Sequence, residues 1–95
     1  MVAHPIRPAD TQAALARQVR HIIHARKGIR LRRLRLNTDL SQELGFDTVD
    51  LVDIILELER CFQLGIPDEV PLHTVGDCVR YIGSHLPAHH PEMAA

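Results

Sequence analysis

The sequence predicts a single all-α domain, a bundle of three main helices and one short helix. Three segments place apolar residues at helical spacing, and no two segments alternate convincingly enough to pair as β-strands. At 95 residues the chain is near the size at which one apolar core becomes sufficient. We therefore expect one domain over residues 1–95, with a core at about 10–86 and flexible ends at 1–9 and 87–95.

The first helix is predicted over residues 11–27. Asp10 can serve as its N-cap, and Gly28 can end it. Its apolar face is expected to consist of Leu15, Val19, Ile22 and Ile23. Residues 29–36 then alternate between isoleucine or leucine and arginine, but they have no second strand to pair with. We expect an extended loop there, whose leucines tuck under the helices.

The second helix is predicted to run from about residue 48 to residue 63, with Asp47 as its N-cap and Gly65 near its end. Five residues form the stripe expected to face the core: Leu51, Ile54, Ile55, Leu58 and Phe62. Three acidic residues share one flank: Asp50, Asp53 and Glu57. Three apolar residues project roughly opposite the core stripe: Val49, Val52 and Leu56. In a small bundle these three are either covered by a loop or exposed for a partner.

The third helix is predicted to follow the segment Thr74–Asp77, which has the pattern of a variant capping box, and to end before Pro87. Its apolar residues at helical spacing are Val75, Cys78, Val79, Ile82 and Leu86. Between the second and third helices, the segment Ile66–Glu69 predicts a turn. Residues 68–73 can form at most a short helix, because Pro71 interrupts them.

The two halves of the chain carry opposite charge. Residues 1–36 hold nine lysines and arginines against one aspartate, a net charge of +8. Residues 37–95 hold two arginines against eleven acidic residues, a net charge of −9. Separation on this scale indicates an electrostatic interaction surface or pairing between the two halves within the fold.

Several classes of protein do not match the sequence. No segment approaches the roughly 20 apolar residues of a membrane span, and Met1–Asp10 lacks the hydrophobic run of a signal peptide. Cys61 and Cys78 have no metal-like spacing and are expected to be free, partly buried thiols of a reduced, cytoplasmic protein. Ser41 and Ser84 lack the glycine context of a nucleophile elbow, so we predict no catalytic residues and no enzyme activity.

The histidines do not predict a metal site. His21 and His24 share a helix face, but the remaining histidines of the chain are scattered. Those considered as ligands, His73, His85, His89 and His90, have no cysteine or carboxylate at a ligand-like spacing. We expect exposed histidines and no bound metal.

The most informative segment is Glu43–Asp53, in which a leucine-glycine turn delivers the hydroxyl of Thr48 to the first turn of an acidic helix. It resembles the attachment site of acyl and peptidyl carrier proteins. In that family a leucine-glycine turn precedes an aspartate, a serine that carries phosphopantetheine, and an apolar residue. The resemblance continues through Phe62, Ile66–Glu69 and Thr74-Val75, and it covers about two thirds of the chain. Threonine stands here where the family has serine.

This resemblance implies a carrier that presents a phosphopantetheine-tethered acyl group at Thr48, beside Asp47, in fatty acid, polyketide or peptide metabolism. It also implies two kinds of partner, a phosphopantetheinyl transferase and acyl-processing enzymes, which would dock electrostatically on the second helix. The expected docking surface comprises Val49, Asp50, Val52, Asp53, Leu56 and Glu57. We expect the protein to be a monomer.

Two other functions stay open. The extra methyl of Thr48 restricts its rotamers and crowds its hydroxyl, so the chain can instead be a pseudo-carrier, an interaction module without a prosthetic group. The stretch Arg26–Arg35 departs from the family and fits a small basic nucleic-acid binder. Because this stretch offers no aromatic residue for base stacking, we predict neither a nucleic-acid nor a membrane ligand. We expect its charges to pair with the acidic half or to remain solvated.

Overall fold

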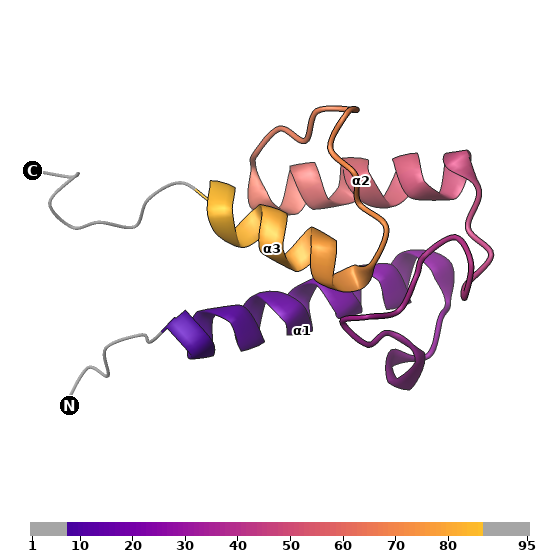
Figure 1. The fold of residues 1–95 in the computed structure, drawn as a ribbon, viewed down its shortest axis with the longest axis horizontal. Coiled ribbons are helices and arrows are strands. Elements are labelled where there is room, and N and C mark those ends of the chain that lie inside the picture. The colour runs from indigo at the N-terminus through magenta and orange to yellow at the C-terminus, as the bar shows by residue number, and fades with distance from the viewer. Residues whose placement is uncertain (1–7, 87–95) are drawn as a thin grey trace, which may run out of the picture.

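The structure, a computed structural model, describes residues 8–86 and confirms the predicted all-α class. Within these residues it contains three α-helices, α1 (Pro8–Lys27), α2 (Thr48–Phe62) and α3 (Val75–His85) (Figure 1). A single-turn 3₁₀ helix, η1 (Leu31–Arg33), lies between α1 and α2. The predicted number of helices, three long and one short, is therefore correct for the described part of the chain.

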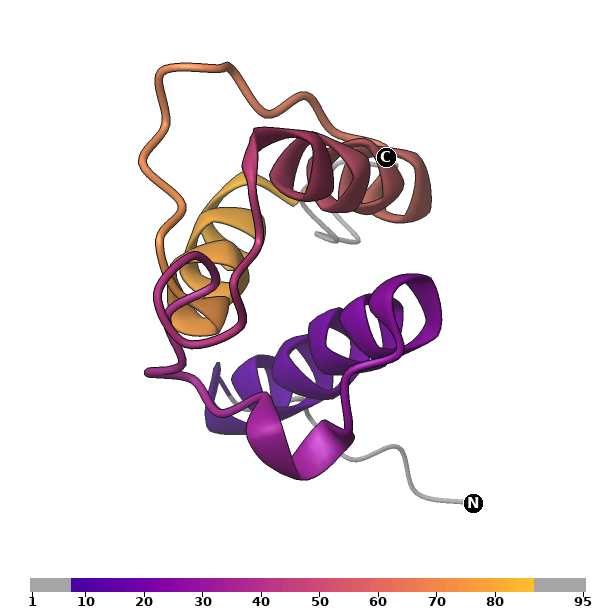
Figure 2. The same ribbon diagram turned by 90° about the vertical axis from the view of Figure 1, so that its right-hand side faces the viewer.

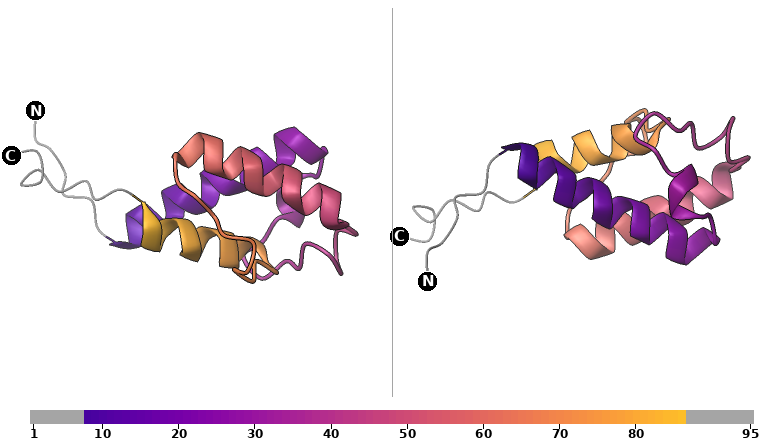
Figure 3. Two further views of the ribbon diagram at one scale, coloured as in Figure 1. Left: turned by 90° about the horizontal axis from the view of Figure 1, so that it is seen from above. Right: turned by 90° about the horizontal axis from the view of Figure 1, so that it is seen from below.

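The packing of the α-helices is centred on α1. Both α2 and α3 run opposite to α1, and α1 packs against both of them (Figures 1 and 3). As a result, the C-terminal end of α1, the η1 turn and the N-terminal end of α2 lie at the same end of the molecule (Figures 1 and 2). The loop over residues 63–74 brings the chain back, so that α3 also begins near this end.

One apolar core joins the helices and the loops between them. The buried side chains are Leu15, Val19 and Ile23 of α1, Ile54 and Leu58 of α2, Val75, Cys78, Val79 and Ile82 of α3, and Leu34, Leu40, Phe46 and Ile66 of the connecting segments. The predicted core stripe of α2 is confirmed, since its other three members, Leu51, Ile55 and Phe62, are half-buried against this cluster. Burial of these surfaces is the main stabilising contribution to a fold of this size.

The start of α1 differs from the prediction. The helix begins at Pro8, so Asp10 lies inside it and is not its N-cap. Proline is well suited to the first turn, because its fixed φ is already helical and its missing N–H would have no partner there. The flexible ends predicted at 1–9 and 87–95 fall almost entirely outside the described residues.

The short helix also lies elsewhere than predicted. It occupies Leu31–Arg33, inside the segment expected to be an extended loop, whereas residues 68–73 contain a turn and no helix. Two hydrogen bonds from α1 hold the segment in place: Arg20 Nη2 donates to the carbonyl of Leu31 at 2.7 Å, and the His24 ring lies 2.8 Å from the carbonyl of Ile29. The sequence pattern contained no signal for these contacts.

The predicted packing of the leucines in this segment is only partly correct. Leu34 is fully buried and Leu31 is half-buried, as expected. Leu36, however, is 52% exposed and does not tuck under the helices.

The loop before α2 lies beside the start of α3 (Figure 2), and backbone hydrogen bonds join the two segments. The amides of Val75 and Gly76 donate to the carbonyls of Thr38 and Leu36, at 3.1 and 2.7 Å, and the amide of Leu40 donates to the carbonyl of His73 at 2.8 Å. Two of these donors belong to the first turn of α3, whose N–H groups have no partner within the helix. The loop that leads to α2 is therefore positioned by α3.

No helix among residues 8–86 is both long enough and apolar enough to cross a membrane.

Candidate functional site

The turn that leads into α2 is set by local chemistry. Gly45 has a positive φ of 72°, a conformation that glycine adopts without the steric cost of a Cβ. Asp47 then caps the helix as predicted: its carboxylate accepts from the amide of Asp50 at 2.9 Å, and the carboxylate of Asp50 accepts from the amide of Asp47 at 3.2 Å. This reciprocal capping box fixes where α2 begins. Thr48 is consequently the first residue of the helix.

The side chain of Thr48 is exposed, and its hydroxyl makes no hydrogen bond within residues 8–86. The backbone amides of Thr48 and Val49 also have no acceptor among the described residues, because the cap from Asp47 reaches the amide of Asp50 instead. Such amides, at the positive end of a helix dipole, are well placed to receive a phosphate oxygen. The hydroxyl and its surroundings therefore fit a phosphodiester-linked group.

An exposed apolar stripe runs along α2 from its first turn. Val49 is 74% exposed, Val52 46% and Leu56 58%, and no loop of the described chain covers them. They follow one another at i, i+3 and i+7, which places them on one side of the helix. Of the two arrangements left open by the sequence, the structure shows the exposed one.

The acidic flank of α2 faces the C-terminal end of α1 and is paired with it. Lys27 Nζ lies 2.9 Å from Asp50 Oδ1 and 3.1 Å from Asp53 Oδ2, and Arg26 Nη2 lies 2.5 Å from Asp53 Oδ1. Glu57 is 3.8 Å from the second terminal nitrogen of Arg26 and also pairs with Arg60 of its own helix. Three carboxylates are thus opposed by three cationic side chains, and the flank is close to neutral.

These ion pairs shift the pKa of each partner toward its charged form. Hydrogen bonds from Lys27, Arg26 and Arg60 lower the pKa of Asp50, Asp53 and Glu57, respectively. In return, the hydrogen bond to Asp50 raises the pKa of Lys27, and the hydrogen bond to Asp53 raises that of Arg26. The hydrogen bond to Glu57 likewise raises the pKa of Arg60, so all six groups carry their full charge near neutral pH.

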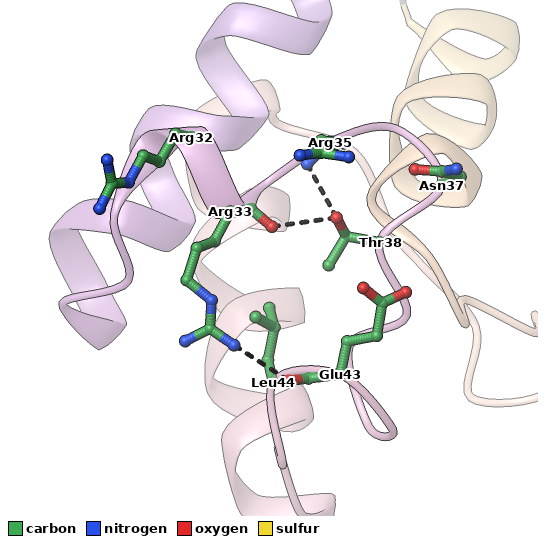
Figure 4. Close-up of a pocket in the computed structure, with 7 residues that line it drawn as sticks. All are labelled: Arg32, Arg33, Arg35, Asn37, Thr38, Glu43 and Leu44. Carbon is green, nitrogen blue, oxygen red and sulfur yellow. Dashed lines mark hydrogen bonds between the residues drawn. The ribbon is translucent and has the colours of Figure 1, made fainter.

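Among the described residues, the expected pairing between the two halves of the chain is confirmed for Arg26 and Lys27 only. Four other basic side chains of the same stretch, Arg30, Arg32, Arg33 and Arg35, are exposed and form no ion pair with a carboxylate of residues 8–86. We call these four residues the arginine loop. Three of them line a cavity of about 410 Å³ together with Asn37, Thr38, Glu43 and Leu44 (Figure 4).

The thiols and imidazoles form no further site in the described residues. Cys61 is exposed, and Cys78 is buried, which raises the pKa of its thiol to about 12, so the prediction of partial burial describes neither cysteine well. No group of three or more histidine, cysteine, aspartate or glutamate side chains within residues 8–86 is arranged to hold a metal ion. His89 and His90 lie outside the described part of the chain.

Comparisons with known proteins agree with this geometry. Residues 17–82 match the family described as "Phosphopantetheine attachment site". An acyl carrier protein from Amoebophilus asiaticus (strain 5a2) is 42% identical over 53 residues, which cover 54% of this chain and 66% of the relative. The solution structure of the apo doublet acyl carrier protein from prodigiosin biosynthesis matches with a TM-score of 0.70 and 27% identity, over 90% of this chain and 44% of that chain. This chain therefore spans just under two thirds of the length of the Amoebophilus protein and less than half of the length of the doublet protein.

The matched residues contain the whole of α2, the capping boxes that begin α2 and α3, and the four buried residues of the connecting segments, Leu34, Leu40, Phe46 and Ile66. It covers well over half of the 95-residue chain. The resemblance predicted from the segment around Thr48 is thereby confirmed at the level of the family. The chain belongs to the phosphopantetheine attachment-site family and is an acyl carrier protein-like domain.

Proposed function

We propose that this domain carries phosphopantetheine on the hydroxyl of Thr48 and presents a tethered acyl group to partner enzymes of fatty acid, polyketide or peptide metabolism. The observation that carries the proposal is the position of Thr48, the first residue of α2, with an exposed hydroxyl that has no hydrogen bond within the described residues. Loading by a transferase requires an accessible oxygen at this position. The prosthetic group supplies the thiol to which an acyl group is attached.

The residues around Thr48 support attachment in two ways. The free amides of Thr48 and Val49 can donate to the oxygens of a phosphodiester, and the helix dipole favours its negative charge. The neighbouring carboxylates would oppose that charge, but Asp50 is neutralised by Lys27 at 2.9 Å. Asp47 remains next to the hydroxyl, held in place as the cap of α2.

We further propose that partner enzymes dock on α2. The exposed stripe of Val49, Val52 and Leu56 supplies apolar contact, and an apolar patch of this kind on a small domain is typical of an interaction site. Asp50, Asp53 and Glu57 lie along its edge. Since these carboxylates are already paired with α1, we expect apolar burial to contribute more to docking than charge.

A pseudo-carrier that never acquires the prosthetic group is the second candidate, and one observation favours it. Threonine carries a β-methyl that serine lacks, so the hydroxyl of Thr48 is more crowded than that of the serine at the family's attachment position. Such a protein would keep the fold and the docking stripe and would serve as an interaction subunit.

Intact mass spectrometry of the protein purified from its native host distinguishes the two candidates. A carrier should show a species heavier by the mass of a phosphopantetheine group, and fragmentation should assign that mass to Thr48. A single unmodified species, from cells that load other carrier proteins, would support the pseudo-carrier and contradict the first proposal.

A further inference from the structure

The arginine loop is an unusual charged surface for a chain whose net charge is −1. Its four guanidinium groups come from six consecutive residues, 30–35, and all four side chains are exposed. Within residues 8–86, none of them lies within ion-pair distance of a carboxylate, although the chain as a whole is rich in acidic residues. The fold therefore leaves this cluster of positive charge unneutralised, while it neutralises the acidic flank of α2.

The backbone of this loop is held in one conformation by a buried polar side chain. Thr38 is 3% exposed, and its hydroxyl donates to the carbonyl of Arg33 at 3.0 Å and accepts from the amide of Arg35 at 2.9 Å (Figure 4). The amide of Thr38 also donates to the carbonyl of Arg35 at 3.0 Å, and its carbonyl accepts from Val75 of α3. The loop is consequently anchored on the inside, while its arginine side chains are exposed on the outside.

The cavity at this loop is predominantly basic. Arg32, Arg33 and Arg35 line it, against one acidic residue, Glu43, whose carboxylate accepts from the amide of Asp39 at 3.1 Å. Arg33 Nη2 donates to the carbonyl of Glu43 at 3.2 Å, which ties one guanidinium to the turn that leads into α2. The planar guanidinium groups have further N–H donors available for carboxylate oxygens.

The location connects this surface to carrier function. The η1 turn lies at the same end of the molecule as the start of α2, because Lys27 and Asp50 join the end of one helix to the beginning of the other (Figures 1 and 2). A protein that reaches Thr48 from this end would therefore approach the arginine loop as well. The carboxylates of Asp50, Asp53 and Glu57 are already paired, whereas the four guanidinium groups have no carboxylate partner within residues 8–86, so the arginine loop presents a cluster of unpaired positive charge on this side.

We propose that the arginine loop is an interaction surface for an acidic patch on a partner protein, at which carboxylates of the partner pair with Arg30, Arg32 and Arg35. In this interaction the carrier domain supplies the positive charge and the partner the negative charge. The acidic second helix had predicted the reverse arrangement. A folded loop loses little entropy on docking, which favours a protein surface of complementary shape. Nucleic acid is the less suitable occupant, because the loop and its cavity contain no aromatic side chain on which a base could stack.

The proposal can be tested on the unmodified protein, so its outcome does not depend on whether Thr48 is loaded. Three probes are titrated into ¹⁵N-labelled protein at low ionic strength: an oligoglutamate peptide, an oligolysine peptide of equal length, and a short DNA duplex. Amide shifts map the contact surface, and exposed charges are least screened under this condition. We expect oligoglutamate to produce saturable shifts in residues 30–38.

The loop variant carries two substitutions, Arg32→Gln and Arg35→Gln, at side chains that make no hydrogen bond within the described residues. The control variant is Arg17→Gln, at an exposed arginine in the middle of α1. The loop variant should weaken oligoglutamate binding by about fivefold or more, and the control by less than about twofold. Circular dichroism should show that all variants remain folded.

Three results would overturn the proposal. Oligoglutamate that produces no saturable shifts in residues 30–38, or shifts unaffected by the loop variant, would show that the loop does not recognise carboxylates. Tighter binding of oligolysine, with shifts in α2, would show that the acidic flank is the electrostatic surface. Tighter binding of the DNA duplex than of oligoglutamate would identify a nucleic-acid surface instead.

Discussion

Lys27 Nζ lies 2.9 Å from Asp50 Oδ1, so the last residue of α1 is joined to the first turn of α2. The same ammonium group contacts Asp53 at 3.1 Å, and Arg26 adds a second contact to that carboxylate. Four charged side chains therefore hold together two helices whose connection is 20 residues long. This network has consequences for stability, for docking and for the prediction of interfaces from charge.

The ion pair of Asp53 should make stability depend on pH. Its pKa in the folded protein is lowered from the ordinary value of 3.8, chiefly by the hydrogen bond from Arg26. The contribution to stability is therefore present above the ordinary value and is lost as the pH falls through the lower, folded-state pKa. Asp53→Asn should reduce the free energy of unfolding at about pH 7, and its difference from the parent should shrink toward about pH 3. Urea unfolding at each pH, followed by circular dichroism, gives the free energy of unfolding of the parent and of the variant.

Asp68→Asn is the matched control for this experiment, because Asp68 is exposed and forms no ion pair within residues 8–86. It should change the free energy of unfolding little at either pH. If the difference between parent and Asp53→Asn is the same at neutral and acidic pH, the ion pair does not contribute to stability.

Gly76 should not tolerate a side chain. A Cβ at this position would lie 2.8 Å from the carbonyl oxygen of Leu36. This oxygen cannot easily move away, because it accepts a hydrogen bond from the amide of Gly76. Gly76→Ala should therefore lower the free energy of unfolding by about 1 to 3 kcal/mol, the usual cost of overpacking. Thermal or urea denaturation gives the value.

Gly83 in the same helix provides the comparison. A Cβ there would meet only flexible side-chain ends, Leu15 Cδ1 at 3.3 Å and Gln12 Nε2 at 3.5 Å. Because alanine is a better helix former than glycine by about 1 kcal/mol, Gly83→Ala should be neutral or stabilising. Equal destabilisation by both substitutions would mean that the contact with Leu36 is not what requires glycine.

Loading of Thr48 should be slow, and replacing it by serine should make loading fast. In-line attack requires close alignment of the hydroxyl oxygen with the pyrophosphate of coenzyme A, and the threonine methyl disturbs this alignment. Incubated with a promiscuous phosphopantetheinyl transferase and coenzyme A, the parent should be modified partially, Thr48→Ser readily and Thr48→Ala not at all. Intact mass gives the extent of each reaction. An unmodified but folded Thr48→Ser variant would show that the transferase does not dock, and rapid complete loading of the parent would show that the methyl is no obstacle.

The exposed stripe of α2 should matter for docking and not for folding. In a Thr48→Ser background, replacing Val52 and Leu56 by alanine should lower kcat/KM for loading by about tenfold, because apolar surface that the transferase would cover is removed. The free energy of unfolding should change by less than about 0.5 kcal/mol, since both side chains are exposed. Leu36→Ala, at 52% exposure, is the control outside the stripe. A loading rate unaffected by the α2 substitutions would place the docking surface elsewhere.

The features that the sequence predicted well are local ones. Asp47 and Thr74 both form capping boxes with a residue three positions on, so the relevant contacts are contained in four consecutive residues. The core stripe of α2 follows from helical period alone. The resemblance to the family was likewise carried by local segments, the turn before Thr48 together with Ile66–Glu69 and Thr74-Val75.

The features that were missed depend on residues far apart in the chain. Arg26 and Asp53 are 27 positions apart, so the sequence predicted pairing between the two halves of the chain but not which residues would pair. The place of the short helix was missed because Arg20 of α1 donates to the carbonyl of Leu31, 11 positions away, and no local pattern indicated that contact. The need for glycine at position 76 likewise becomes visible only when Leu36 is placed against it.

The unequal exposure of the two cysteines affects how loading can be measured. Phosphopantetheine ends in a thiol, so thiol-reactive dyes are a convenient way to count loaded molecules. Cys61 is exposed and would contribute a constant background to such a count, whereas Cys78 is buried in the core with a pKa of about 12 and would react only when α3 separates from its neighbours. In a Cys61→Ser protein, the fast reaction of the phosphopantetheine thiol would therefore report loading. The slow reaction of Cys78 would report opening of the helical bundle in the same time course.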